Sequence, residues 1–253
     1  MEITEFLTKI DLKGASNTIF KKEEKDAKIV SETGETIKKI SGINSYTYFD
    51  NGSAAVTGFL RYEKPFPEQI FSLSPSTLKG ILEEADNLEV VDSFLVGKTD
   101  NGNIVKDLEL TKWRTVRAKY DNPPVLIKNN IVKTIIRRSQ IIDPASLTIV
   151  GDGNELVFTT YSNIGSSSSK VKIKSDLKIE SMLEASTFLE ILRMVGDMDI
   201  RLYIDSSNLE DRKKSPVKIE ISDSNAIISY YITETIKPEL KKEVKEEENL
   251  EMN

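Results

Sequence analysis

The sequence contains no cysteine and no histidine. Without cysteine, the chain has no disulfide, no thiolate metal site and no thiol nucleophile. Without histidine, it lacks the side chain most often used for proton transfer near neutral pH, and it can form neither a Ser-His-Asp triad nor a histidine-containing zinc site. Lys, Asp and Glu chemistry remains open, but we predict a protein that is not an enzyme and uses no cofactor and no metal.

Long apolar runs are also lacking. No segment approaches the roughly 18–20 apolar residues that a membrane-spanning helix needs. The first six residues, Met1 to Phe6, have neither the basic region nor the apolar region of a signal peptide. We therefore expect an intracellular protein with no membrane partner.

The composition is that of a soluble globular protein. The 253 residues are 38% hydrophobic and 30% charged, which suits one large domain or two of ordinary size. The formal net charge is −6, whereas a simple nucleic-acid binder is usually basic. An acidic chain can still carry a basic stripe, so the net charge alone does not exclude a polyanionic partner.

The first half of the chain predicts two helices among several strands. Residues 2–10 place apolar side chains at the i, i+3, i+4, i+7 spacing of a helix face. Ser74 and Pro75 suit the N-cap and first position of a helix that ends near Ala85. Asn51-Gly52 is a favourable hairpin turn. Strands are expected at Asn17–Lys21, Ala27–Ser31, Ile37–Ile40, Ser45–Phe49, Ala54–Arg61, Ile70–Leu73, Leu88–Val96, Asn103–Glu109 and Trp113–Ala118.

The second half predicts the same kind of order. Helices are expected at Asn130–Ile142 and Glu184–Val195, with a hairpin turn at Gly151–Asn154. A mobile loop is expected at 165–169 and a polar loop at 207–215. Strands are expected at Ser146–Val150, Glu155–Tyr161, Lys170–Lys174, Leu177–Leu183, Asp199–Ser206, Pro216–Ser222 and Ala226–Thr233.

Two sequence echoes indicate an internal repeat. Ser76-Thr77-Leu78 matches Ser186-Thr187-Phe188, and Ala15–Phe20 matches Ala145–Val150. Pro123-Pro124 interrupts the pattern near the midpoint of the chain. We therefore predict two similar α+β domains, 1–118 and 129–236, joined by a linker at 119–128. The Glu- and Lys-rich tail, 237–253, is predicted to be disordered.

This order resembles that of the DNA sliding clamps, which include proliferating cell nuclear antigen, its archaeal relatives and the clamps of T-even-type phages. Val132–Lys174 is similar to the phage-type second domain, and Glu184–Ile232 is similar to the end of a clamp subunit. Within it, Ile227–Ile232 is similar to the last strand of the cellular clamps. The resemblance implies two clamp-type domains per subunit, with antiparallel sheets outside and helices lining a ring.

The resemblance also implies function and partners. A homotrimer, or one member of a heterotrimer, would encircle double-stranded DNA without sequence preference and dock a DNA polymerase and a clamp loader. A viral or archaeal origin would place it in the cytoplasm of a prokaryotic cell or a virus-infected host.

Phosphate contacts need Lys or Arg on or beside the helices that would line the ring. The candidates are Lys9, Lys13, Lys79, Lys128, Lys133, Arg137, Arg138 and Arg193. Clamp partners dock a peptide in an apolar pocket beside the linker. The resemblance implies for that pocket Val125, Leu126, Ile127, Tyr230 and Ile232.

Three motifs are set aside. Asp197-x-Asp199 could suggest a metal pair, but we expect it to end a helix and start a strand. Gly151–Asn154 lacks the spaced acidic residues of a calcium loop, and 165–169 lacks the Lys-Ser/Thr of a phosphate-binding loop. Other functions stay open. A clamp fold could also serve transcription or repair. The chain could instead be a structural protein of an unrelated α+β fold.

Overall fold

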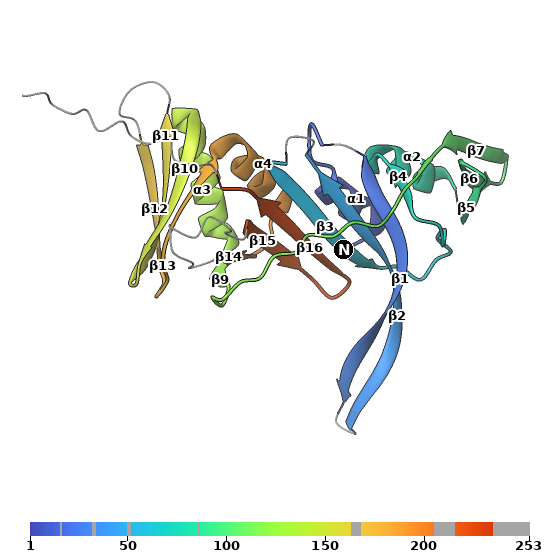
Figure 1. The fold of residues 1–253 in the computed structure, drawn as a ribbon, viewed down its shortest axis with the longest axis horizontal. Helices are drawn as coiled ribbons and strands as arrows, with labels where there is room; N and C mark the ends of the chain where they lie inside the picture. Colours follow the sequence, from blue (N-terminus) through green and yellow to red (C-terminus); the bar gives the residue numbers. More distant parts are fainter. Residues whose placement is uncertain are drawn as a thin grey trace, which may run out of the picture.

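The computed structural model describes residues 1–15, 17–31, 34–49, 52–85, 87–162, 168–204 and 216–234. In these residues, four helices and three antiparallel sheets form an α+β fold elongated along one axis (Figure 1). The predicted loop at 207–215 and tail at 237–253 lie outside the described residues, as does most of the loop at 165–169.

The four helices form where the apolar periodicity predicted them, within a residue or two at each end. Ser74 caps the second helix as expected, because its hydroxyl accepts a hydrogen bond from Thr77 N at 3.1 Å, and Pro75 takes the first helical position. The helices are α1 (Ile3–Ile10), α2 (Pro75–Glu84), α3 (Asn129–Ile142) and α4 (Ala185–Val195).

The largest sheet has nine strands in the order β8-β4-β1-β2-β3-β16-β15-β14-β9. Five strands come from the first half of the chain and four from the second. Antiparallel pairing of β3 with β16, from Ala54↔Ile232 to Leu60↔Ala226, joins the two groups. The strands are β1 (Thr18–Ser31), β2 (Gly34–Tyr48), β3 (Ala54–Arg61), β4 (Phe71–Leu73), β8 (Glu109–Leu110), β9 (Val125–Ile127), β14 (Ile200–Tyr203), β15 (Val217–Ser222) and β16 (Ala226–Ile232).

Two smaller sheets lie at opposite ends of the long axis (Figure 1). The four-stranded sheet has the order β12-β11-β10-β13, which repeats the β3-β2-β1-β4 order of the large sheet. The three-stranded sheet, β5-β6-β7, repeats the β14-β15-β16 hairpins. Their strands are β5 (Asn87–Val91), β6 (Phe94–Thr99), β7 (Gly102–Asp107), β10 (Pro144–Asp152), β11 (Glu155–Ser162), β12 (Ser168–Lys174) and β13 (Lys178–Glu184).

The core lies between the helices and one face of the sheets. Alternate residues of β3 and β16, such as Val56 and Tyr230, are fully buried toward α1. Gly58 of β3 is required by this packing, since a Cβ there would lie 2.7 Å from the Phe6 ring of α1. The opposite face of the large sheet carries a different set of side chains, and the chain from 111 to 124 crosses that outer face (Figure 1).

Three strand predictions were wrong. The four short strands expected between 17 and 49 are two long ones, β1 and β2, paired from Ile19↔Tyr46 to Ser31↔Gly34. The strand expected at Leu88–Val96 is a hairpin, β5-β6, whose turn includes Asp92 with φ of 54°. Trp113–Ala118 forms no strand, because the segment crosses over the sheet and pairs with none of its strands.

Candidate DNA-binding face and outer face

The four helices pack side by side in the order α2-α1-α4-α3. They cover the inner side of the sheets, opposite the face that residues 111–124 cross. Seven of the eight predicted DNA-binding cations have side chains at the surface of this helical layer or at its rim. They are Lys13, Lys79, Lys128, Lys133, Arg137, Arg138 and Arg193.

Lys9 is the exception, because only 8% of its surface is exposed. Its ammonium donates hydrogen bonds to Met194 O at 3.1 Å and Val195 O at 2.9 Å, the last carbonyls of α4. Such carbonyls have no partner within their own helix. Lys9 therefore holds α1 against the end of α4, and we assign it a structural role in place of the predicted phosphate contact.

Lys133 and Lys128 each have an acidic neighbour after α4. Lys133 Nζ lies 2.6 Å from Asp197, and Lys128 Nζ lies 2.8 Å from Asp199. These lysines hold the pKa of both carboxyls below the ordinary value of 3.8. The two carboxylates are ionised at neutral pH and offset part of the positive charge.

Asp199 also accepts a hydrogen bond from the backbone N–H of Asn129, the first residue of α3. Because its pKa is lowered in the folded state, its contribution to stability is present above the ordinary carboxyl pKa and is lost as pH falls through the lowered value. We expect wild type to melt above an Asp199→Asn variant at pH 7, and the gap to close as the pH falls below the ordinary carboxyl pKa of 3.8. Thermal melts followed by circular dichroism between pH 7 and pH 2 test this, and a gap that persists at pH 2 contradicts it.

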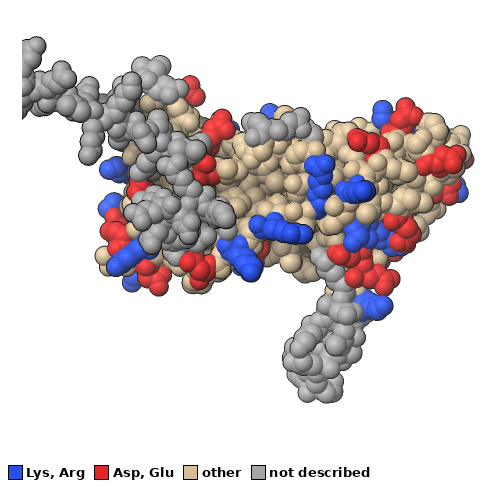
Figure 2. All heavy atoms as spheres, in the orientation of Figure 1, with Lys and Arg blue, Asp and Glu red and all other residues tan. Residues whose placement is uncertain are grey.

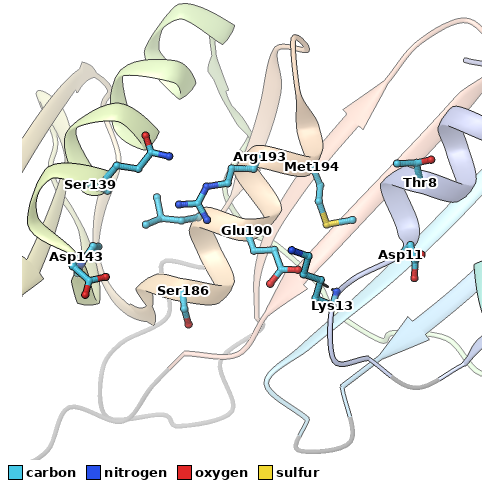
Figure 3. Close-up of a pocket in the computed structure, with 12 residues that line it drawn as sticks. Thr8, Asp11, Lys13, Ser139, Asp143, Ser186, Glu190, Arg193 and Met194 are labelled. Carbon is cyan, nitrogen blue, oxygen red and sulfur yellow. Dashed lines mark hydrogen bonds between the residues drawn. The ribbon is translucent and has the colours of Figure 1, made fainter. Parts of the chain in front are cut away.

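A cleft of about 600 Å³ opens on this face between α1, α4 and the end of α3 (Figure 3). Lys13 and Arg193 point into it together with the carboxylate of Glu190. Glu190 Oε1 accepts a hydrogen bond from Lys13 N at 3.1 Å, which fixes the chain after α1 against α4. Asp11 and Asp143 also line the cleft, so it holds three carboxylates beside the two cations that the two halves of the chain contribute.

The remaining cations lie to either side of this cleft. Lys79 of α2 reaches Thr8 Oγ1 at 3.4 Å, and Arg137 is exposed on α3. Arg138 instead donates to Lys170 O at 2.6 Å, so its guanidinium sits at the start of β12. Among the described residues, no ion pair joins Lys13, Lys79, Arg137 or Arg193 to a carboxylate. The structure thus keeps these four available to a ligand.

The structure does not bring the five predicted pocket residues onto one surface. Ile127, Tyr230 and Ile232 are buried on the inner side, where Tyr230 Oη donates to Lys9 O at 2.9 Å. Leu126 is 53% exposed on the outer side, because successive residues of a strand point to opposite faces. Val125 is half-buried. The alternation of side chains between the two faces of β9 and β16 is the sequence signal that would have shown which of these residues share a face.

The outer face of the large sheet holds side chains that the sequence did not single out. Tyr46 and Tyr48 of β2 have ring centroids 5.6 Å apart, and Arg114 lies 5.4 Å from the Tyr48 ring. Burial raises the pKa of Tyr46, although Arg114 opposes the shift. Farther along the same face, Ile227 of β16 is 49% exposed.

Two further findings concern other kinds of site. In the part of the chain that the structure describes, no group of three Asp or Glu side chains is arranged to hold a metal ion. No helix among the described residues is long and apolar enough to cross a membrane.

No protein-family model and no curated protein matches this sequence. Solved structures do. Proliferating cell nuclear antigen from Entamoeba histolytica is 12% identical with a TM-score of 0.61, covering 93% of this chain and 96% of that one. The antigen of A. fulgidus, bound to the C-terminal region of FEN-1, is 13% identical with a TM-score of 0.63, covering 94% and 96%. The antigen from Thermococcus kodakaraensis is 13% identical with a TM-score of 0.59, covering 93% and 98%. The chain therefore has the α+β clamp fold that the sequence resemblance implied.

Proposed function

We propose that this chain is a subunit of a ring-shaped DNA sliding clamp, a protein without enzymatic activity that tethers a polymerase to duplex DNA. The observation that carries the proposal is the arrangement of its sheet edges. Within the chain, β3 is the edge of the β3-β2-β1-β4 group, and β16 pairs with it from the adjacent hairpins. Each of these two groups of strands has a second copy in the chain, and each second copy has the corresponding edge strand.

In the second copy of each group, the corresponding edges are β12 and β7. Neither strand has a partner on its outer side among the described residues. The two edges lie at opposite ends of the molecule, so they cannot pair within one chain (Figure 1). Pairing β7 of one copy with β12 of the next would repeat the β16–β3 junction. A head-to-tail contact of this kind closes into a ring when its rotation permits, and we propose a homotrimer.

The charges at the two ends are complementary. The β12 end exposes Lys170, Lys172 and Lys174, of which Lys172 pairs with Glu155, whereas the β7 end exposes Asp107 and Lys106 on the strand and Asp100 in the turn before it. Opposite charges across an interface steer association and fix its register. This complementarity favours a second copy of the same chain as the partner.

In such a ring the helical layer faces the hole. The proposed contacts to phosphate are Lys13, Lys79, Arg137 and Arg193, with Lys128, Lys133 and Arg138 at the rim. Contacts to phosphate carry no sequence information, which suits a protein that moves along DNA. The net charge of −6 would disfavour duplex binding at the acidic parts of the surface.

The proposed partners are a DNA polymerase and a clamp loader. One of the similar structures holds the C-terminal region of FEN-1 on the antigen, which supports docking of a partner's terminal segment on this fold. The predicted pocket residues do not share one surface here, so we place docking on the outer face around Leu126.

The direct test is retention on circular DNA after loading. We expect the protein to stay on closed circular duplex through gel filtration at 0.5 M salt, and to be released when the circle is cut with a restriction enzyme. Equal loss from circular and linear DNA would contradict encirclement. Capture of RNA polymerase components in place of a DNA polymerase would favour the alternative of a clamp-fold transcription factor.

A triple substitution tests the inner face. The Lys79→Gln/Arg137→Gln/Arg193→Gln variant should bind a 30-base-pair duplex at least about tenfold more weakly at 50 mM salt. The slope of log affinity against log salt should also become shallower by about 2.7, because each lost phosphate contact removes about 0.9. Fluorescence anisotropy measures both. An unchanged slope would place duplex binding elsewhere.

A further inference from the structure

The chain between β8 and β9 is amphipathic although it belongs to no helix or strand. From Lys112 to Tyr120, cations are exposed and apolar residues are half-buried against the outer face of the large sheet. Tyr120 anchors one end, since its hydroxyl donates to Pro216 O at 2.6 Å and its ring lies 5.5 Å from that of Tyr203. Trp113 anchors the other end, 5.9 Å from Lys21 Nζ.

The exposed side of this segment is basic. Lys112, Arg114, Arg117 and Lys119 are all exposed, and no acidic residue occurs between Glu109 and Asp121. Figure 2 shows Lys and Arg side chains gathered across the middle of this face, along the path of the segment in Figure 1, while Asp and Glu lie mostly toward the two ends. In the described residues, no ion pair joins Lys112, Arg114 or Arg117 to a carboxylate.

Aromatic rings lie directly beside these cations. Arg114 lies over the Tyr48 ring, and Tyr46 stands next to Tyr48 on β2. Neither ring is fully buried. Cations in a row with aromatic side chains at their flank form the arrangement that binds single strands, because phosphates pair with the cations and bases stack on the rings.

We propose that this surface, the outer stripe of Lys112, Arg114, Arg117 and Lys119 with Tyr46 and Tyr48, binds single-stranded nucleic acid. The rings favour a single strand over a duplex, since paired bases cannot stack on them. They also favour nucleic acid over an acidic peptide, because the carboxylates of a peptide would pair with the cations and leave the rings without a stacking partner. The outer stripe lies within one chain, so it does not depend on the proposed ring.

The test is fluorescence anisotropy with a labelled 12-nucleotide oligothymidylate at 50 mM salt. A Lys112→Gln/Arg114→Gln/Arg117→Gln variant should bind at least about tenfold more weakly than wild type, and its salt slope should become shallower by about 2, since each lost contact with a single strand removes about 0.7. Tyr46→Ala should weaken binding severalfold with no change in slope. A control with the same change of charge, Arg61→Gln/Lys64→Gln/Lys98→Gln, alters exposed positions outside the stripe, of which Arg61 pairs with Glu63 and Lys98 with Glu89, and should stay within twofold of wild type.

Two results would overturn the inference. One is a loss of affinity in the control equal to that in the stripe variant, which would mean that net charge alone governs binding. The other is displacement of the oligothymidylate by a decaglutamate peptide at lower concentration than by unlabelled oligothymidylate, which would identify a peptide site. Retention of the same proteins on circular duplex is measured in parallel. If wild type binds the single strand through the stripe but is not retained on circles, the inference stands and the proposed clamp function fails.

Discussion

A Lys170→Glu/Lys174→Glu variant should scatter light as a 28.5 kDa monomer at concentrations where wild type has a mass near three times that value. Lys170 is the third residue of β12 and Lys174 is its last, whereas Asp107 ends β7 and Asp100 lies in the turn before it, at the opposite end of the molecule. Replacing these lysines by glutamate would place negative charges opposite Asp100 and Asp107 where β12 of one copy pairs with β7 of the next. We expect the dissociation constant to rise at least about 100-fold, which corresponds to about 2.7 kcal/mol.

The restoring variant sharpens this experiment. Adding Asp100→Lys/Asp107→Lys to the same chain re-creates opposite charges with the signs exchanged, and the trimer mass should return. A Lys64→Glu/Lys178→Glu variant, changed equally but at exposed positions outside β7, β12 and the strands that pair with them, should keep the wild-type mass. If the β12 variant remains trimeric, the interface lies elsewhere. A wild type that is monomeric at every concentration would require different subunits or exclude the ring.

The second large effect is expected at Lys9. Lys9→Met should lower the free energy of unfolding by about 3 kcal/mol, because it leaves two carbonyls at the buried end of α4 without their charged donor. Urea unfolding followed by circular dichroism measures the change. Tyr230→Phe, which removes the neighbouring hydrogen bond to Lys9 O, should cost only about 1 kcal/mol.

Lys13 supplies the matched control for this position. Lys13→Met removes an exposed lysine four residues farther on and should change stability by less than about 0.5 kcal/mol. It should weaken duplex binding, whereas Lys9→Met should leave the duplex affinity of the folded protein unaltered. A Lys9→Met protein as stable as wild type would refute the structural role assigned to that ammonium.

The helices were the most predictable part of the fold. Their apolar stripes repeat over two to four turns, and Ser74-Pro75 marks a start, so local sequence suffices. The strands of the first half were harder, because β1 runs through six successive charged residues, 21–26, where no apolar alternation indicates a strand. The sequence also gave no sign that residues 113–118 lack a strand partner. Their β-branched and aromatic residues serve to anchor a crossing segment, which depends on a sheet built elsewhere in the chain.

The candidate site shows the same division. The cations on α2, α3 and α4 follow from helix faces, and the structure places them on one layer. Lys9 differs because the helix that it meets is 185 residues away in sequence, and no local pattern reports that contact. The predicted pocket residues lie on opposite faces of the large sheet. The family resemblance indicated their positions in the sequence but not the face of the sheet to which each side chain points. The outer stripe was missed because its aromatic partners, Tyr46 and Tyr48, are distant from Arg114 in sequence.

The insertion of β16 between β3 and β15 also bears on how the chain folds. The first group of strands cannot complete its sheet until the last strand has been made, and the hydrogen bond from Tyr230 to Lys9 spans 221 residues. Contacts of such long range slow folding, because the loop must close before they form. On the ribosome, β3 would keep an open edge until β16 has been made, so emergence of β16, rather than of the first half of the chain, should set the moment at which the large sheet forms.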